Sequence, residues 1–374
     1  MSLYHHTLRE RFALARRERG ARHRDIALEL GIPEGELIAA HVGPFSPGPA
    51  EAPAAESPLH AMRLRADWPA LLAELESVGE VMALTRNEHC VHEKVGTYRN
   101  ASHQGLMGLV LGDEIDLRVF YRHWTHGFAL REQTASGAQR SLQFLDAAGQ
   151  AIHKVFAKPQ TDAAAWDALL QRWRDESQTT GLDPAPLALV PPAAERPDAE
   201  IDVEALHSHW ASMRDTHEFF PLLRRHGVSR TQALRLAEPR FAQAVEPDSA
   251  SQLLIAAAQS GASIMVFAGN PGMLQIHTGA VHKVARMGPW INVLDAGFNL
   301  HLREDAVTQA WLVRKPTADG IVSSLELFDA DGRTIAMLFG ERKPGRPERG
   351  DWRGLLAQLQ VLDAQPEAAS CATL

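Results

Sequence analysis

An internal duplication limits the fold of this 374-residue chain more than any other feature of its sequence. The segment SLQFLDAAGQAIHKVF, residues 141–156, aligns without gaps on SLELFDADGRTIAMLF, residues 324–339, and seven of the 16 aligned positions are identical. In both copies, alternating apolar residues flank a turn of the Asp-Ala-x-Gly type, a pattern that predicts a β-hairpin. The chain must therefore fold as two similar units.

Further blocks repeat in the same order, with small insertions between them. EIDLR, which ends at Arg118, matches NLHLR, which ends at Arg303, and GTYRN at 96–100 matches GPWIN at 288–292. A helix, a Gly turn and a second helix are predicted around both Gly31 and Gly227, and a Trp-bearing helix closes each copy. Helices followed by strands and hairpins predict an α+β fold built on antiparallel sheet.

The predicted fold is a tandem structural repeat of two halves, each a large antiparallel β-sheet with flanking helices. The Pro- and Ala-rich stretch at 182–200 cannot hold regular structure and predicts a linker. We therefore expect an N-terminal half over 1–181 and a C-terminal half over 201–374. A second stretch of this kind, at 43–58, separates the first helices from the first sheet.

Composition excludes several classes of protein. The formal net charge of -8 gives no overall basic surface for nucleic acid or an anionic membrane. The two cysteines, Cys90 and Cys371, have no CxxC spacing, charges interrupt the apolar stretches of the N-terminus, and no later segment approaches the roughly 18 uninterrupted apolar residues of a membrane span. We expect a cytoplasmic protein with reduced thiols, no nucleic acid partner and no insertion into a membrane.

One segment favours a different class of protein. RDIALELGIPEGELIAAH, with Gly31 in the turn, resembles a helix-turn-helix and makes a DNA-binding regulator a distant alternative. The helix that would enter the groove, PEGELIAAH, carries two glutamates and no Lys or Arg, so phosphate would repel it.

The two halves differ where a functional site is expected. With Gly31 placed over Gly227, His217 falls opposite Ala21, and by the same alignment the second half gains a cation at position 230. Asp215 and Glu218 have capping-box spacing, which predicts a helix that begins at Asp215. The proline at 221 disfavours a helical residue before it and predicts a break instead. Either arrangement places the imidazole at a helix terminus.

The histidine cluster of the first half does not predict a metal site. His89 and His92, beside Cys90, are three residues apart on a predicted strand and so point to opposite faces. His277, His282 and His301 are interpreted as surface or sheet residues for the same reason.

Six blocks of the sequence resemble one known family. They are NEHCVHEKVGTYRN, GDEIDLRVF, DTHEFFPLLRRHGVSRTQALRL, MGPWINVLDAGFNLHLRE, WLVRKPTADGIVSSLELFD and FGERKPG. They are similar, in family order, to signatures of the cytoplasmic haemin-degrading and haem-trafficking factors of Gram-negative haem uptake systems. The similarity runs from about Thr7 to the helix around Trp352. That family is itself a tandem repeat of two α+β halves, which agrees with the duplication.

The resemblance implies haem as cofactor and His217 as the axial ligand of its iron. A neutral imidazole is a good iron ligand, and its second nitrogen needs an acceptor that fixes the tautomer. The resemblance also places an arginine on the opposite, distal face of the haem. We assign this role to Arg118, with Arg99 and Arg122 as the alternatives that the insertions leave open. A guanidinium there can hydrogen-bond a ligand of the iron.

The resemblance further implies cations for the two haem propionates. The matching positions are Arg230, Lys315 and Arg342. An apolar wall is expected around the ring, and its candidates are Phe219, Phe220, Met273 and Phe339.

Two functions from different classes follow. The first is a carrier in haem trafficking and iron acquisition, which accepts imported haem and transfers it onward. The second is a haem-degrading oxygenase that opens the porphyrin with an external electron donor. No GxGxxG follows a strand to bind a reducing nucleotide, which favours the carrier. The expected partners are haem and a haem oxygenase, a reductase or the haem importer, and the sequence leaves the oligomeric state open.

Overall fold

The computed structural model describes residues 3–43, 58–134, 137–182, 195–343 and 345–362. The first half contains strands β1 (Leu59–Arg63), β2 (Val81–Arg86), β3 (Cys90–Gly96), β4 (Ser102–Gln104), β5 (Met107–Leu111), β6 (Asp116–Phe120), β7 (His126–Thr134), β8 (Gly137–Leu145) and β9 (Ala151–Ala157). The second half contains β10 (Ala242–Val245), β11 (Ile264–Asn270), β12 (Met273–Gly279), β13 (Val284–Met287), β14 (Trp290–Leu294), β15 (Phe298–Arg303), β16 (Gln309–Thr317), β17 (Gly320–Phe328) and β18 (Thr334–Gly340).

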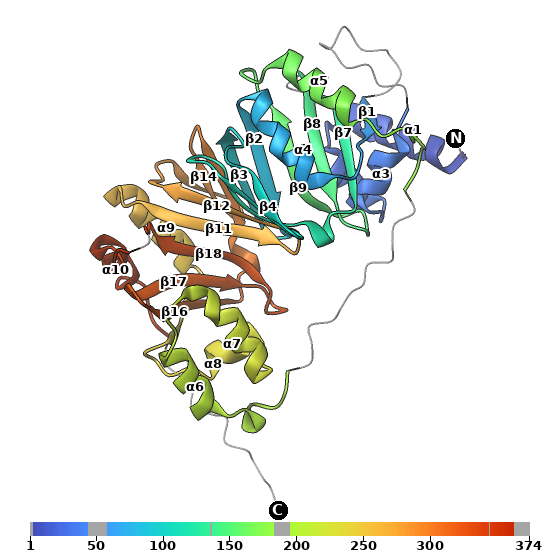
Figure 1. Ribbon diagram of the computed structural model, residues 1–374. Coiled ribbons are helices and arrows are strands. Elements are labelled where there is room, and N and C mark those ends of the chain that lie inside the picture. Colours follow the sequence, from blue (N-terminus) through green and yellow to red (C-terminus); the bar gives the residue numbers. More distant parts are fainter. Residues whose placement is uncertain (1–2, 44–57, 135–136, 183–194, 344, 363–374) are drawn as a thin grey trace, which may run out of the picture.

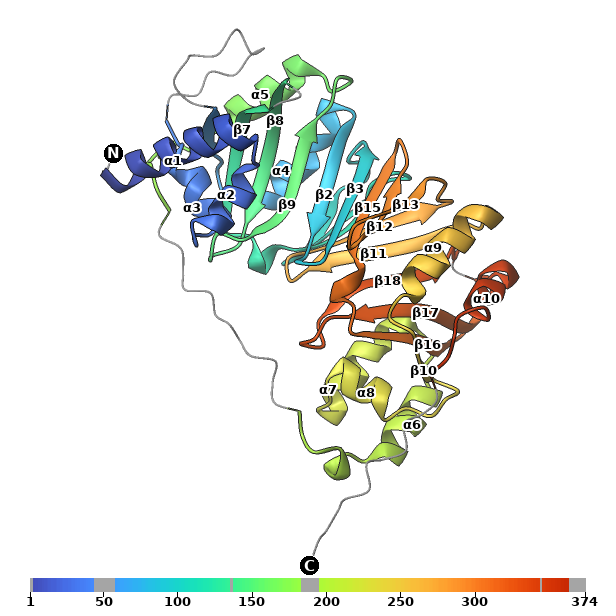
Figure 2. The ribbon, with the colours of Figure 1, turned by 180° about the vertical axis from the view of Figure 1, so that it is seen from behind.

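The α-helices surround these strands half by half (Figures 1 and 2). Those of the first half are α1 (Leu3–Arg19), α2 (His23–Glu29), α3 (Glu34–Ala40), α4 (Trp68–Glu74) and α5 (Ala163–Trp173). Those of the second half are α6 (Val203–Ala211), α7 (Phe219–His226), α8 (Arg230–Arg235), α9 (Ser249–Ser260) and α10 (Gly350–Leu356). Within the described ranges, no helix has the length and apolar character needed to cross a membrane.

The two halves exchange strands. The strands form two nine-stranded sheets, in the orders β1-β7-β8-β9-β2-β3-β15-β14-β13 and β10-β16-β17-β18-β11-β12-β6-β5-β4, and every pairing within them is antiparallel. Each half therefore supplies six strands to one sheet and three to the other, and the junctions are β3 with β15 and β12 with β6. The predicted α+β tandem repeat with large antiparallel sheets is confirmed, and the exchange is an addition that the sequence did not indicate.

The repeat keeps a constant interval from β2 to β9. Ser141 and Ser324 lie 183 residues apart, and the same interval relates β2 to β11, β6 to β15 and β9 to β18. It places Arg118 opposite His301, so the alignment of Arg118 with Arg303 is wrong by two residues. The GPWIN block was also misaligned, because Gly288 corresponds to Gly105 rather than to Gly96. Both are turn glycines with positive φ, 59° and 58°.

The paired helices around Gly31 and Gly227 are confirmed. Both glycines adopt left-handed φ, 68° and 62°, which lets the chain turn sharply between α2 and α3 and between α7 and α8. Helix α3 is buried along most of its length, and Glu34 is only 5% exposed. It therefore has no free face for a DNA groove, which overturns the helix-turn-helix interpretation of this segment.

Apolar side chains gather in separate cores for the two halves. Helices α4 and α5 pack with β2, β5 and β6 in a core built from first-half residues together with Met273. Helices α9 and α10 pack with β11, β14 and β15 in a core built from second-half residues together with Cys90. The exchanged strands thus hydrogen-bond to the partner sheet while they bury side chains against their own half. Cys90 and Met273 are themselves related by the repeat interval.

The proposed linker falls mostly outside the described residues, which omit 183–194. Within 195–200, Asp198–Glu200 forms a short 3-10 helix, η3, so this end of the stretch does hold regular structure. The boundaries at 181 and 201 stay a prediction. The second Pro-rich stretch, 43–58, also lies outside the described residues except at its two ends.

Candidate functional site

His217 lies at the beginning of a continuous helical run. The Asp215 side chain caps the 3-10 helix η4 (Thr216–Glu218) by accepting the backbone N–H of His217 at 2.8 Å, and η4 leads directly into α7. Pro221 falls in the first turn of α7, where a missing N–H costs no helical hydrogen bond. Of the two interpretations of this segment, the helix that begins at Asp215 is confirmed. Glu218 accepts the backbone N–H of Arg214 at 3.2 Å, one residue before the position that a capping box uses.

The imidazole of His217 is open on one side and held on the other. Its side chain is 94% exposed, and Nδ1 lies 2.6 Å from Oδ1 of Asp215. A carboxylate accepts and cannot donate, so the ring proton sits on Nδ1 and the lone pair of Nε2 faces outward. The hydrogen bonds from the His217 backbone and side chain lower the pKa of Asp215, and nearby Arg342 acts in the same direction. The site thus presents one uncommitted imidazole nitrogen.

A buried ion cluster lies beneath α7 and joins three elements. Glu326, on β17, is 0% exposed; it accepts two hydrogen bonds from Arg230 at 2.6 and 2.8 Å and one from Lys315 at 2.7 Å. Burial alone would raise the pKa of Glu326, but Arg230 and Lys315 together hold it well below its usual range. Burial lowers the pKa of Lys315 to about 8 despite this carboxylate. Both cations also lie over the ring of Phe219, at 5.0 and 4.6 Å from its centroid.

Two of the three cations predicted to receive carboxylates thus already have a protein partner. Two positive charges against one negative charge leave a local excess of one positive charge beside α7. Sequence patterns did not predict these ion pairs, because Glu326 is 11 residues from Lys315 and 96 from Arg230. Strand pairing brings Lys315 of β16 to Glu326 of β17, and helix α8 adds Arg230.

The first half carries different residues at the equivalent positions. The repeat places Glu132 opposite Lys315, Gln143 opposite Glu326, and Glu34 opposite Arg230. Lys154 forms an ion pair with Glu34 there, and His23 lies 2.7 Å from Glu34 and 3.0 Å from Glu132. Arg230 and Lys315 thus correspond to acids in the first half, where Lys154 and Arg16 pair with them, so this corner does not favour an anionic ligand.

Arg342, just after β18, is the third predicted cation. Among the described residues, its Nε is buried and has no hydrogen-bond partner. It lies near enough to Asp215 and Glu348 to lower the pKa of the first and to offset the burial that raises the pKa of the second. A guanidinium with unused N–H donors beside the His217 turn can bind an anionic group.

An apolar strip crosses the same face of the sheet as the ion cluster. Directly paired residues share a face of an antiparallel sheet. Glu326 of β17 pairs with Met337 of β18, Met337 pairs with Phe267 of β11, and Phe267 pairs with Ile276 of β12. The apolar strip consists of the half-buried residues on this face of β18, β11 and β12: Met265, Phe267, Leu274, Met337 and Phe339. The rings of Phe267 and Phe339 meet at 4.9 Å, and Arg230 Nη2 lies 3.6 Å from the sulfur of Met337. The ion cluster therefore borders one end of the apolar strip.

Arg118 lies at the other end of the apolar strip. It is on β6 and pairs directly with Leu274 of β12, so it shares the face of the strip, and its side chain is 32% exposed. An ion pair with Asp116 on the same strand holds the guanidinium. The alternatives differ in position: Arg99 is exposed in the loop after β3, and Arg122 is in the 3-10 helix η2 (Tyr121–His123). About four strand spacings of ~4.8 Å, or roughly 19 Å, separate Arg118 from Glu326 across the sheet.

The predicted apolar wall is only partly present. Phe339 belongs to the apolar strip, and Phe220 is 63% exposed next to His217. Phe219 is buried against the ion cluster, and Met273 is fully buried in the core of the first half, away from this face. The wall residues that the sequence interpretation missed alternate along strands, as Met265 and Phe267 do. That period of two was the available signal.

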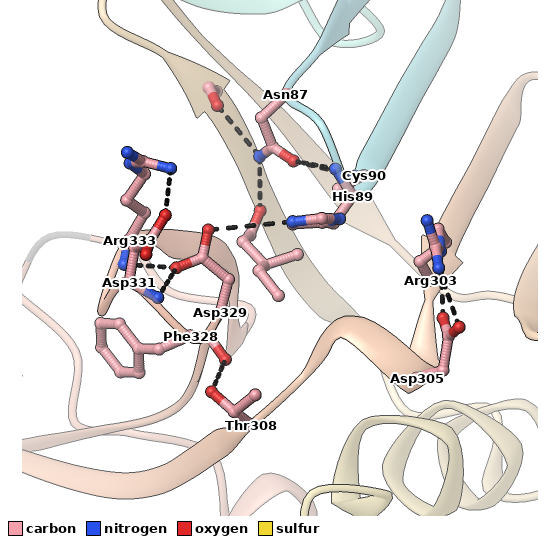
Figure 3. A network of polar contacts seen from close by, with 12 residues as sticks. Asn87, His89, Cys90, Arg303, Asp305, Thr308, Phe328, Asp329, Asp331 and Arg333 are labelled. Atoms are coloured by element: carbon pink, nitrogen blue, oxygen red, sulfur yellow. Dashed lines mark hydrogen bonds and ion pairs between the residues drawn. The ribbon is translucent and has the colours of Figure 1, made fainter. Parts of the chain in front are cut away.

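Three of the histidines set aside as metal ligands, His89, His277 and His301, contact specific side chains. His89 faces Asp329 at 3.8 Å in a network between the halves (Figure 3), and His92 is fully buried. His277 is a sheet residue, one of the two expected positions: it lies on β12, is 5% exposed and stacks on Phe298 at 3.8 Å. His301 bonds Asn292 at 2.7 Å. In the part of the chain that the structure describes, no three His, Cys, Asp or Glu residues form a group able to hold a metal ion.

Known proteins share this sequence and this architecture. A family model for the haemin-degrading HemS/ChuX domain matches residues 48–173 and 227–359, one segment in each half. The chain belongs to this family. The hemin transport protein HmuS of Yersinia pestis is 42% identical over 356 residues, which cover 94% of this chain and 97% of HmuS.

Solved structures of relatives have the same fold over nearly the whole chain. Holo-PhuS, a heme-binding protein from Pseudomonas aeruginosa, is 46% identical with a TM-score of 0.88, and the match covers 96% of this chain and 99% of PhuS. The heme degrading enzyme ChuS from Escherichia coli O157:H7 is 39% identical with a TM-score of 0.83, over 95% of this chain and 99% of ChuS.

Proposed function

We propose that this protein binds one haem through His217 and transfers it onward in haem trafficking. One observation carries the proposal: a 94% exposed imidazole, held at Nδ1 by Asp215, begins the helical run that packs on the Arg230–Glu326–Lys315 cluster, and this cluster borders the half-buried apolar strip. A hemin transport protein and a heme-binding protein are among the relatives of similar length, which supports this ligand.

The residues present fit the chemistry of haem. The ring is apolar and suits the apolar strip, while its two propionates require cations. Arg342 has a buried Nε without a partner among the described residues, and the Arg230–Glu326–Lys315 cluster keeps one positive charge in excess. The equivalent corner of the first half has acids where the cluster has cations, so we expect a single site.

Each residue has a separate part in binding. When bound, haem supplies an iron that takes an imidazole nitrogen as ligand. His217 offers that nitrogen, Asp215 keeps the proton on the other nitrogen, and Arg342 and Arg230 receive the carboxylates. Arg118 lies at the far end of the apolar strip, where its guanidinium can donate hydrogen bonds but cannot coordinate.

Transfer of haem is favoured over its permanent retention because His217, the proposed iron ligand, lies on the surface of the protein. An acceptor protein can approach a nearly fully exposed imidazole without a large rearrangement of this chain. Haem degradation is the second candidate, and the observation in its favour is Arg118 on the strip face, together with the relative ChuS, which is a heme degrading enzyme. The reducing cytoplasm expected from the two cysteines suits either function.

A hemin titration of the purified protein tests the proposal. We expect saturation near one haem per chain and loss or replacement of the proximal ligand in the ferric spectrum of His217→Ala. His226→Ala is the matched control, since His226 ends the same helix and bonds His209 at 2.8 Å. An unchanged spectrum in His217→Ala contradicts the assignment. After addition of ascorbate under air, a persistent Soret band supports the carrier, and its loss with release of iron supports the oxygenase.

A further inference from the structure

Asp215 makes two contacts to His217 with a single oxygen. Its Oδ1 accepts the backbone N–H of His217 at 2.8 Å and faces Nδ1 of the same residue at 2.6 Å. The first contact caps η4, and an ordinary helix cap would stop there. The second contact adds a charged acceptor to the ring nitrogen opposite the one that faces outward.

The turn that carries Asp215 is fixed to the sheet. Glu218 accepts the N–H of Arg214 at 3.2 Å, and the carbonyl of Arg214 accepts the N–H of Ala318, in the β16–β17 turn, at 2.8 Å. The Asp215 carboxylate therefore has a defined place relative to the imidazole. A short bond from a ring N–H to a carboxylate moves electron density into the ring and raises the basicity of the other nitrogen.

We propose that Asp215 is a positioning residue that makes His217 a strong electron donor, so that the site retains ferric haem in preference to ferrous haem. This inference rests on the proposed function, because it requires His217 to be the ligand. An electron-rich axial ligand stabilises the more highly charged iron, so reduction weakens binding relative to an imidazole with a neutral acceptor.

The substitution Asp215→Asn separates this role from capping. Asparagine caps helices as well as aspartate does, and its side-chain oxygen still accepts both hydrogen bonds. Only the negative charge is removed. A residue that acts as a cap alone would tolerate the change without any effect on the bound iron.

The experiment compares ferric and ferrous haem affinities of the wild type and Asp215→Asn, with the iron–histidine stretching frequency of the ferrous complex as a second readout. We expect the ratio of ferric to ferrous affinity to fall roughly tenfold and the stretching frequency to drop. Asp202→Asn is the control: Asp202 caps α6 by accepting the N–H of Ala205 at 2.9 Å, and the variant loses the same charge from the same helical layer. It should leave both readouts unchanged.

A further variant tests the sign of the effect. The positive charge of Arg342 acts on the Asp215 carboxylate and offsets part of its effect on His217. Arg342→Gln should therefore raise the ratio of ferric to ferrous affinity, while it weakens the binding of both forms. Equal ratios in wild type and Asp215→Asn, with histidine ligation intact, overturn the inference and leave the proposed function standing. A ferric spectrum that is the same in the wild type and in His217→Ala overturns the proposed function itself. In the protein without haem, ¹⁵N shifts of His217 should show a protonated Nδ1, and a proton on Nε2 contradicts the inference.

Discussion

Asn87 and Asn270 make the same hydrogen bonds from opposite halves of the molecule. Asn87 Nδ2 donates to the carbonyls of Gly269 and Ile335 at 3.1 and 2.8 Å (Figure 3), and Asn270 Nδ2 donates to those of Arg86 and Ile152 at 2.9 and 2.8 Å. Asn87 and Asn270, Arg86 and Gly269, and Ile152 and Ile335 are each 183 positions apart. Each asparagine also closes its own turn with its Oδ1. Asn87 accepts the backbone N–H of Cys90, and Asn270 accepts the backbone N–H of Gly272. The halves are thus joined by a reciprocal pair of amides.

Removal of either amide should destabilise the protein by a similar amount. Asn87→Ala leaves two carbonyls and two turn N–H groups without their partner, and we expect a loss of about 1–3 kcal/mol in the free energy of unfolding. Asn270→Ala should lose an amount of the same order, as measured by urea denaturation. Gln252→Ala, which removes an exposed amide of α9 that bonds Asp248 at 2.8 Å, is the control. A large effect at Gln252 and none at Asn87 would contradict a joining role.

Local sequence identity predicted the repeat, but it did not predict which strands pair with each other. The hairpins at 141–156 and 324–339 were correct because their identities mark a shared turn. Arg118 was set against Arg303 because both blocks end in Leu-Arg, whereas strand register aligns it with His301. The exchange of β4–β6 and β13–β15 leaves no mark in the sequence, because an antiparallel edge pairs equally with either half.

The same limit applies to the candidate site. His217 stood out because its counterpart is Ala21, a difference that alignment can show. The need for an acceptor on the second ring nitrogen was foreseeable, but the sequence did not identify Asp215 as that acceptor. The role of Glu326 could not be predicted, because two sheet partners and a helix meet there only after folding.

Arg118→Ala should change the sixth position of bound ferric haem and leave His217 as ligand. A cation at that end of the apolar strip favours hydroxide over water on the iron, so its removal should raise the pH at which the spectrum converts. The measurement is a pH titration of the visible spectrum. Arg122→Ala is the control, since Arg122 bonds His123 at 2.9 Å and is not on the strip face. If Arg118 supports only β6, the variant will lose stability with the same spectral titration.

Buried neutral histidines should make the fold sensitive to acid. Burial lowers the pKa of His153 and of His277 to about 3 and that of His41 to about 4, against 6.5 for an unrestrained histidine. Below pH 6.5 the unfolded chain binds protons that the folded chain does not, so stability is full above that pH and falls as the pH drops toward 4.

The slope of that loss can be assigned to a residue. Each such histidine contributes about 1.4 kcal/mol per pH unit between its two pKa values. His153 lies between Thr85 Oγ1 at 2.8 Å and the hydroxyl of Tyr98 at 2.5 Å, and His153→Gln keeps polar atoms there without a titrating group. Urea denaturation at pH 7, 6 and 5 should show that His153→Gln is less stable than the wild type. Its free energy of unfolding should also depend less steeply on pH, by the equivalent of about one proton. The same slope in the variant as in the wild type would show that other groups carry the acid sensitivity.

Separation of the two halves should reveal how far the exchange of strands controls the site. A chain cut between 182 and 200 gives a second half with His217, Arg230, Lys315 and Arg342, but Arg118 and the three strands that extend its sheet stay with the first half. Each half alone exposes the edge of β3 or of β12, and exposed edges pair with other chains. We therefore expect either half to associate with itself, as measured by light scattering after gel filtration.

Mixing the two halves should return a one-to-one complex, because the reciprocal bonds of Asn87 and Asn270 form only between unlike halves. Its hemin spectrum should match that of the intact chain, whereas the second half alone should bind hemin more weakly and with a different sixth ligand. The Asn87→Ala first half should reconstitute less of the complex at the same concentration. Stable, monomeric and fully haem-competent second halves would mean that the sheet does not depend on β4–β6. Histidine-ligated binding that is stronger in the first half would move the site away from His217 altogether.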